Sequence, residues 1–437
     1  MSTASRLGAP LVAALVAAGS VGALPAAAQD PSVVAPAGDV SFMVFGDPAE
    51  LVAYQELVTS FEAAQPDIDV ELIHIPDQAD YRQRLGLDFS AGTPADIVLI
   101  NYRRYAQFAA RGVLEPLGPY LDQSELVGEA EFYPEALEPF RWMGELMCIP
   151  QNLSSLVVYY DKALFDAAEL PYPTDHWTWE EFLATAKALT LDTDADGRTD
   201  QFGLGTEASI FRVAPFIWQN GGELVTLSDR GLPIRLAFDT PAAREAIQWF
   251  VDLQVVHHVV PSAVEEAAED SESRFQNGRT AMFLNSRRGV PTYRQITGFD
   301  WDVAALPQHT EQAGILHSDA YCMPASAASK DAAWKFIEYA NSAPGQSVIA
   351  RSGRTVPSLV EVSQSDAFLD PAAKPANSQV FLSSLPTIRA VPVLPGWVDI
   401  EELAGEELER AFYGNASVDE AIAEAIARTQ VFFGPGE

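Results

Sequence analysis

Short apolar runs alternate along the chain with longer stretches in which apolar residues recur every three or four positions. The first run, Val40–Phe45, predicts a strand. The next segment begins Asp47-Pro48-Ala49-Glu50, the pattern of a capped helix N-terminus, and apolar residues then recur at helical spacing. Further strands are predicted at 70–75 and 97–100, with a helix between them. Such alternation is typical of a mostly parallel sheet with helices on both faces.

Residues 145–162 (ELMCIPQNLSSLVVYYDK) interrupt this alternation. They contain two apolar runs separated by Pro150 and a polar patch. Proline has no backbone N–H to give to a sheet, so one uninterrupted central strand is disfavoured. Downstream, residues 319–324 repeat the pattern of a short apolar segment that holds a Cys and ends at a Pro. We interpret the pair as outward and return crossings between two lobes; the alternative is two unrelated buried strands.

A second alternating block follows the first crossing. Thr178 and Glu181 form a capping box that opens a helix. Helices are predicted at 209–219 and 241–256, and strands at 281–284 and 301–306. After the return crossing, helices are predicted at 331–341, 401–412 and 418–432.

The length and the N-terminal segment bound the organisation of the chain. A single core stops growing at about 250–300 residues, so 437 residues predict two domains. Residues 1–28 carry a basic start, an apolar small-residue run and Ala26-Ala27-Ala28, which is the pattern of a secretory signal peptide. Residues 29–38 form a Pro/Ala-rich leader. We therefore expect an exported protein, in a periplasm or at the outer face of the cell membrane.

Charge and cysteine usage narrow the expected chemistry. The formal net charge of −34 disfavours binding to nucleic acid or to anionic lipid. The two cysteines, Cys148 and Cys322, lie in the two proposed crossings, and export permits a disulfide between them. Two separate buried thiols are the alternative.

One acidic loop has the spacing of a calcium site. Asp192, Asp194, Asp196 and Asp200 occupy positions 1, 3, 5 and 9 of such a loop, with Gly197 at position 6. The twelfth position is Gly203, so the usual bidentate acid is missing there. We expect no cofactor, with calcium at this loop as the alternative to a solvated acidic turn.

Several motifs together resemble a known family. In chain order they are residues 178–183 (TWEEFL), 194–197 (DADG) before 201–203 (QFG), 219–222 (QNGG), 277–282 (NGRTAM), 332–337 (AAWKFI) and 417–421 (SVDEA). The chain is similar to the family 1 extracellular solute-binding proteins of ABC importers, which include maltose- and other sugar-binding proteins. The resemblance implies an α/β, two-lobed, periplasmic-binding-protein-like fold (type II), with two mixed or parallel sheets flanked by helices and a hinge of crossing strands. It places the N-terminal lobe at 39–148 and 322–375, and the C-terminal lobe at 149–321 and 376–437.

Ligand contacts are expected just after strands and in the crossings, because clefts in α/β sheets form outside the carboxyl ends of strands. Sugars also need aromatic faces and polar partners. The candidates are Gly46, Asp47, Asn101, Tyr102, Gln151, Asn152, Trp218, Asn220, Arg287, Asp319 and Trp397. The resemblance adds weight to Trp397, because sugar-binding relatives place a stacking aromatic in that segment. Maltose-binding relatives also have a stacking Trp at the end of the third strand, where this chain has Ile100 and Asn101, so a maltodextrin site is disfavoured.

The function predicted from these features is a receptor and not an enzyme. The receptor captures a small solute, a sugar by the resemblance, and presents it as a monomer to the permease subunits of an ABC importer. The alternative is a secreted carbohydrate-active hydrolase with two paired carboxylates. Chance pairs arise easily among 61 acidic residues, and the chain has no G-x-S-x-G or H-E-x-x-H motif.

Overall fold

The protein is described by a computed structural model that covers residues 38–434. The predicted signal peptide (1–28) and nearly all of the leader (29–38) lie outside the described residues. Within 38–434, no helix combines the length and the apolar character needed to cross a membrane.

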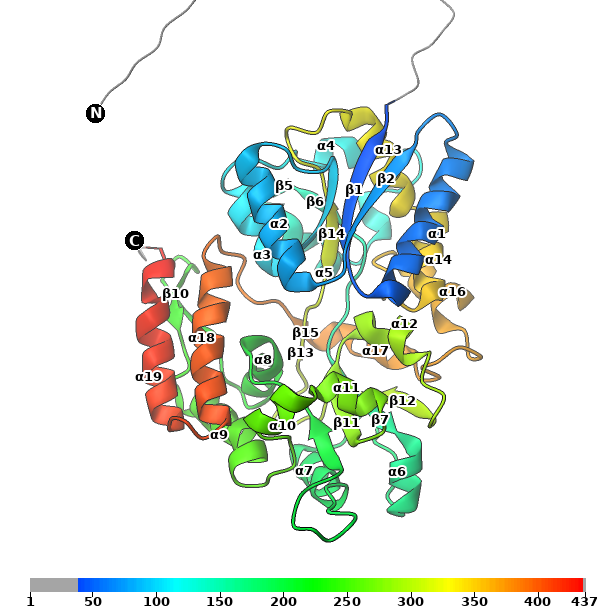
Figure 1. Cartoon of the computed structure of the whole chain (residues 1–437). Coiled ribbons are helices and arrows are strands. Elements are labelled where there is room, and N and C mark those ends of the chain that lie inside the picture. Colours follow the sequence, from blue (N-terminus) through cyan, green and yellow to red (C-terminus); the bar gives the residue numbers. More distant parts are fainter. Residues whose placement is uncertain (1–37, 435–437) are drawn as a thin grey trace, which may run out of the picture. The chain divides into compact units, whose positions relative to one another are not determined.

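The first sheet has five strands in the order β2-β1-β3-β14-β6. Strands β1 (Val40–Phe45), β2 (Val70–Ile75) and β3 (Ile97–Asn101) are parallel, as their apolar runs predicted. Helices α1 (Pro48–Ala64), α2 (Gln78–Ala91) and α3 (Tyr102–Ala109) follow these strands in turn. Figure 1 shows α2 and α3 on one side of this sheet and α1 and α14 (Ala343–Ser352) on the other. The predicted N-terminal cap of α1 is present and forms a capping box, with Asp47 and Glu50 as its two side chains.

The second sheet has four strands in the order β12-β7-β11-β8. Its strands are β7 (Val157–Asp161), β8 (Phe202–Gly205), β11 (Thr280–Asn285) and β12 (Trp301–Ala304). Strand β8 is parallel to β11, whereas β7 is antiparallel to both of its neighbours. Helices α7 (Trp179–Ala188), α8 (Ile210–Gln219) and α9 (Pro241–Val255) belong to the same block.

The two predicted crossings pair with each other in the first sheet. Strand β6 (Cys148–Pro150) lies beside β14 (Asp319–Cys322), and the chain leaves β6 to enter β7 of the second sheet. Cys148 faces Cys322 across this antiparallel pair, with their Cα atoms 4.5 Å apart, and the two residues form a disulfide. The disulfide prediction is therefore confirmed. The lobe boundaries stay predictions; β6 and β14 each span one of them.

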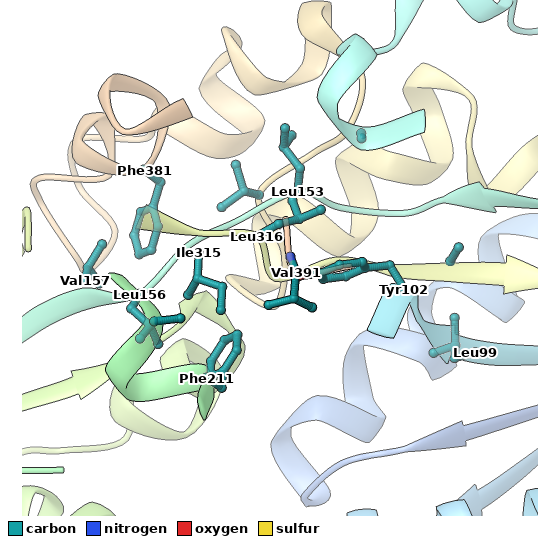
Figure 2. Packing of buried hydrophobic residues seen from close by; sticks show 14 of the residues in the cluster. Leu99, Tyr102, Leu153, Leu156, Val157, Phe211, Ile315, Leu316, Phe381 and Val391 are labelled. Atoms are coloured by element: carbon teal, nitrogen blue, oxygen red, sulfur yellow. The ribbon is translucent and has the colours of Figure 1, made fainter. Parts of the chain in front are cut away.

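Three chain segments connect the part of the chain around the first sheet with the part around the second. The first is 151–156, which leaves β6, and the second is the return segment 313–318, which leads into β14. The third passes through α17 (Gln379–Ser383) and β15 (Ile388–Arg389) to the second block. Strand β15 pairs in parallel with β13 (Gly314–Ile315) of the return segment. Figure 2 shows apolar side chains of this region, among them Leu153, Leu156, Leu316 and Val391. We call 151–156, 313–318 and 384–391 the hinge segments.

The C-terminal helices differ slightly from their predicted bounds. Helix α18 (Trp397–Phe412) begins four residues before the predicted 401, since the turn at Gly396 acts as its N-cap. Helix α19 (Val418–Thr429) starts where its predicted range does, with a capping box of Ser417 and Glu420. The remaining elements are α4 (Gly118–Leu121), α5 (Pro134–Leu137), α6 (Lys162–Ala167), α10 (Ala263–Ala268), α11 (Ser271–Gln276), α12 (Val290–Tyr293), α13 (Lys330–Ala340), α15 (Val360–Ser363), α16 (Asp366–Leu369), β4 (Arg141–Trp142), β5 (Glu145–Leu146), β9 (Val225–Leu227) and β10 (Pro233–Leu236).

Candidate functional site

The loop after β1 holds two of the predicted residues. Gly46 is buried with φ of +131°, and a Cβ there would lie 2.6 Å from Oε2 of Glu50, so only glycine suits the position. Asp47 caps α1, since its Oδ1 accepts hydrogen bonds from the N–H of Ala49 (2.8 Å) and of Glu50 (3.0 Å). The other oxygen of Asp47 accepts from the hydroxyl of Thr292 on α12. The carboxylate thus joins the first sheet to an element of the second block.

Four other predicted residues meet where β3 ends, β14 begins and the first hinge segment leaves β6. Asn101 donates to Oδ1 of Asp319 at 3.1 Å, directly across the β3–β14 pair. The N–H of Asp319 donates to Oδ1 of Asn152 at 3.0 Å, and the N–H of Gln151 donates to the carbonyl of Asp319 at 3.0 Å. Gln151 also donates to the hydroxyl of Tyr54 at 3.2 Å. These side chains form one hydrogen-bonded junction, buried except for the half-buried Asn101.

A buried ion network adjoins this junction, and sequence reasoning missed most of it. Glu50 is 1% exposed and lies between two arginines. Its Oε1 is 2.7 Å from Nε of Arg354, which is also 1% exposed, and its Oε2 is 3.2 Å from Nη1 of Arg288. Burial opposes the charge of Arg354, but Tyr54 and the carboxylates of Glu50 and Asp319 raise its pKa overall. The carboxylate of Glu50 therefore links Arg354, which follows α14, to Arg288, which follows β11.

Arg287 points away from this network. It is 1% exposed; its Nε donates to the carbonyl of Gly353 at 3.1 Å and its Nη1 to the hydroxyl of Ser378 at 2.9 Å. Its guanidinium lies 4.6 Å from the ring centroid of Phe368. Burial lowers the pKa of Arg287 to about 9. In this conformation its neighbour Arg288 reaches the network, and the role of Arg287 as a ligand contact stays a prediction.

The predicted aromatic faces are buried in this conformation. The hydroxyl of Tyr102 accepts from the N–H of Val391 at 3.2 Å, and burial raises its pKa well above the usual range. Trp218 lies in α8 with the guanidinium of Arg389 4.9 Å from its ring centroid. Trp397 is fully buried at the start of α18, and its indole N–H has no hydrogen-bond partner within residues 38–434.

Asn220 follows the last residue of α8 and lies apart from the junction. Its amide donates to the carbonyl of Ala242 at 2.9 Å and to Glu245 at 3.2 Å. It therefore ties α8 to the start of α9. Its role as a ligand contact stays a prediction.

An aromatic residue absent from the prediction lies at the start of α8. The ring of Phe211 has the guanidinium of Arg103 4.5 Å from its centroid and the ring of His317 at 5.2 Å. Figure 2 labels Phe211 with Ile315 of the return hinge segment and Tyr102 of α3. Arg103 also pairs with Glu401 of α18 at 2.5 Å, so it connects the two blocks. Phe211 is thus a further candidate for stacking.

The electrostatics at His317 are set by arginines. Burial lowers the pKa of His317 well below its usual range, and the positive charges of Arg103, Arg288 and Arg354 lower it further. The ring is therefore neutral near pH 7. A neutral imidazole beside guanidinium groups and buried carboxylates offers donors and acceptors to a polar ligand.

The comparisons with known proteins identify the family. The model of the bacterial extracellular solute-binding proteins matches residues 46–347, which is more than half of the chain. The chain belongs to this family. The predicted resemblance is therefore confirmed.

Relatives of this solute-binding protein cover nearly its whole length. A binding protein of Brucella abortus is 26% identical over 405 residues, which are 90% of this chain and 93% of the relative. The mannitol-binding protein of Pseudomonas aeruginosa is 26% identical over 419 residues, covering 86% and 89% of the two chains. An ABC substrate-binding protein of Listeria monocytogenes, solved in complex with cycloalternan, has a TM-score of 0.82 at 24% identity and covers 90% of this chain and 98% of its own. This likeness confirms the two-lobed fold.

The acidic loop of this solute-binding protein keeps its carboxylates close together. Oxygens of the exposed Asp192, Asp194 and Asp200 lie within 4.8 Å of one another. The same side chains bind the loop's own backbone: Asp192 accepts from the N–H of Gly197 at 2.8 Å, and Asp200 accepts from the N–H of Thr193 at 2.7 Å. Asp196 likewise accepts from a backbone N–H, that of Arg198. Calcium binding here stays a prediction.

Proposed function

We propose that this protein is an extracytoplasmic receptor that binds a carbohydrate or polyol between its two lobes and delivers it to an ABC importer. The observation that carries the proposal is the junction of Asn101, Gln151, Asn152 and Asp319 beside the ion network of Glu50. Hydroxyl-rich ligands are recognised by such convergent amides, carboxylates and guanidiniums, with an aromatic face nearby. Phe211, whose ring lies beside the guanidinium of Arg103, is the proposed aromatic face.

The relatives support a carbohydrate-like ligand. One is named for mannitol, and the Listeria monocytogenes protein was solved with cycloalternan. The two ligands differ greatly in size, so they support the polyhydroxylated class and not one compound.

Lobe closure is the proposed mechanism. In the conformation described here, Thr292 bonds Asp47, Arg288 pairs with Glu50, and Arg103 pairs with Glu401. Each pair joins an element next to the first sheet with one from the second block. A ligand that contacts both sides in this conformation has more contacts than in an open one, and this difference shifts the population toward closure.

We further propose that the protein binds its ligand without converting it, as an exported monomer in a periplasm or at the outer face of the cell membrane. The carboxylates of Asp47, Glu50 and Asp319 all accept hydrogen bonds or ion pairs from the protein. Such contacts suit carboxylates that stabilise the protein's conformation and not carboxylates that act on a substrate. The hydrolase alternative predicts release of product from a bound glycan.

A binding screen tests the proposal. The mature protein is titrated by calorimetry with monosaccharides, oligosaccharides, polyols and sugar phosphates, and bound ligand is recovered and analysed by mass. Saturable binding with unchanged ligand is the expected result. Product formation would instead favour the hydrolase, and a screen with no carbohydrate or polyol bound would contradict the proposed ligand class.

A further inference from the structure

A cavity lies away from the candidate site, at the C-terminal end of α8. Its volume is about 220 Å³, and Gln219, the last residue of α8, lines it. Phe211 of the candidate site is eight residues earlier on the same helix, so about 12 Å along the axis separates the two positions. The cavity is therefore distinct from the proposed sugar site.

Residues of all three hinge segments line this cavity. Ser155 comes from the first segment, Gly314 from the return segment, and Thr387 from the third passage. These segments are bonded to one another here: the hydroxyl of Ser155 accepts from the N–H of Ile315 at 3.0 Å, and Gly314 pairs with Ile388 in β13–β15. The shape of the cavity thus depends on how the hinge segments pack.

The polar wall of the cavity presents hydrogen-bond acceptors. The hydroxyls of Ser383, Ser384 and Thr387 each donate to a backbone carbonyl three or four residues earlier in the chain, at 3.2, 2.7 and 2.9 Å. Their lone pairs are then the groups left for a molecule in the cavity. Ser155 already accepts one hydrogen bond, and its own O–H has no acceptor within residues 38–434. A ligand with several hydroxyl groups, which both donate and accept hydrogen bonds, matches this wall.

The charge and size of the cavity narrow the ligand class. Among the lining residues, all of which lie within 38–434, none is Lys or Arg, and the ionisable ones are the exposed Asp175 and His176. An anion would therefore find no permanent countercharge on the wall. Leu156, Leu306 and Val380 give the wall an apolar part. The volume lies below the roughly 300–1,000 Å³ of sites for drug-sized ligands, which excludes an oligosaccharide.

We propose that this hinge cavity is a second binding site, for a small neutral polyhydroxylated solute of the size of a linear polyol or a single sugar ring. Its occupant contacts the three segments that connect the lobes. A bound solute stabilises the conformation in which those segments enclose the cavity. In that same conformation the Glu50–Arg288 and Arg103–Glu401 ion pairs are formed. By linkage, the occupant raises the affinity of the main site, by about fivefold if the coupling has the usual lower magnitude.

Hydrogen exchange of the mature protein with xylitol as the probe tests this site. We expect protection of backbone amides in 312–316 and 380–387. Ser384→Phe fills the cavity and should abolish this protection. Ser90→Phe is the matched control, because Ser90 is an exposed helical serine whose hydroxyl also donates to the carbonyl four residues earlier. It should leave the protection unchanged.

Two further arms keep the test decisive. Thr387→Val removes one acceptor with little change of shape and should weaken xylitol binding about fivefold, which tests the site even if Ser384→Phe does not fold. Inorganic phosphate at the same concentration should give no protection of these segments, because no Lys or Arg lines the cavity. The proposal is overturned if xylitol protects neither segment, if protection persists in Ser384→Phe, or if phosphate protects as well as xylitol does. Protection confined to residues near Phe211 and Arg288 would place xylitol in the main site, leaving the proposed function intact and this inference wrong.

Discussion

Removing the charge of Glu50 should destabilise the protein strongly. Glu50 and Arg354 are each 1% exposed and lie 2.7 Å apart, and Glu50 also pairs with Arg288 at 3.2 Å. Glu50→Gln keeps the shape of the side chain but leaves Arg354 buried without its carboxylate. Removing one partner of a buried ion pair costs about 3–5 kcal/mol. The oxygen Oε2 also accepts from the N–H of Asp47 at 3.0 Å, so the cap of α1 is weakened too.

The expected shift of the melting midpoint follows from chain length. With about 2.1 cal/mol/K of unfolding entropy per residue, the chain from 38 to 434 gains roughly 0.8 kcal/mol/K if it melts as one unit. A loss of about 3–5 kcal/mol then lowers the midpoint by about 4–6 °C. The assay is calorimetric melting of ligand-free protein. Glu56→Gln is the matched control, because Glu56 is an exposed residue of the same helix.

A double variant separates the buried charge from the cap. In Glu50→Gln with Arg354→Met, both buried charges are gone, so much of the lost stability should return. If the unfolding free energies of Glu50→Gln and Glu56→Gln agree within about 0.5 kcal/mol, the buried ion network does not stabilise the fold.

Three further predictions concern other parts of the molecule. Arg288→Met should weaken binding of the main ligand by about tenfold or more, while costing less stability than Glu50→Gln because Glu50 keeps Arg354; unchanged affinity in calorimetric titration would remove Arg288 from the site. Cys148→Ser should lower the unfolding free energy by about 5 kcal/mol, since the disulfide spans 174 residues, and a midpoint unaffected by the substitution or by reductant would refute this. The pKa of His317 lies below its usual 6.5 in the folded state, so the unfolded chain binds the extra proton first and stability falls as pH drops from 6.5 toward the folded pKa, by at most about 1.4 kcal/mol per unit. His317→Gln should flatten that part of the stability profile in denaturant melts, and identical profiles would contradict the sign.

The elements of the fold were predictable because their signals are local. The apolar run of β1 and the capping residues of α1 stand within eleven consecutive positions, 40–50, and the structure has both where the pattern indicated. The pairing of Cys148 with Cys322 was predictable because these are the only two cysteines and each lies in a short apolar run that ends at a Pro.

The candidate site was only partly predictable because its contacts are distant in sequence. Asn101 and Asp319 were found as residues that follow or begin strands, and the sheet then brings them together. Glu50 showed a capping role but gave no sign of Arg354, 304 positions away, and no periodicity separates the inward Arg287 from Arg288. Phe211 looked like one more apolar residue of an apolar helix; its position at the N-terminus of α8, facing Arg103, is a tertiary fact.

The most direct test of the central claim is calorimetric titration of the mature protein with the carbohydrate and polyol panel, repeated on Arg288→Met with mass analysis of the recovered ligand. We expect saturable binding of a polyhydroxylated ligand to the main site, weaker binding in the variant, and recovery of the ligand unchanged. Binding that is insensitive to Arg288→Met, conversion of the ligand, or absence of binding across the panel would contradict the claim.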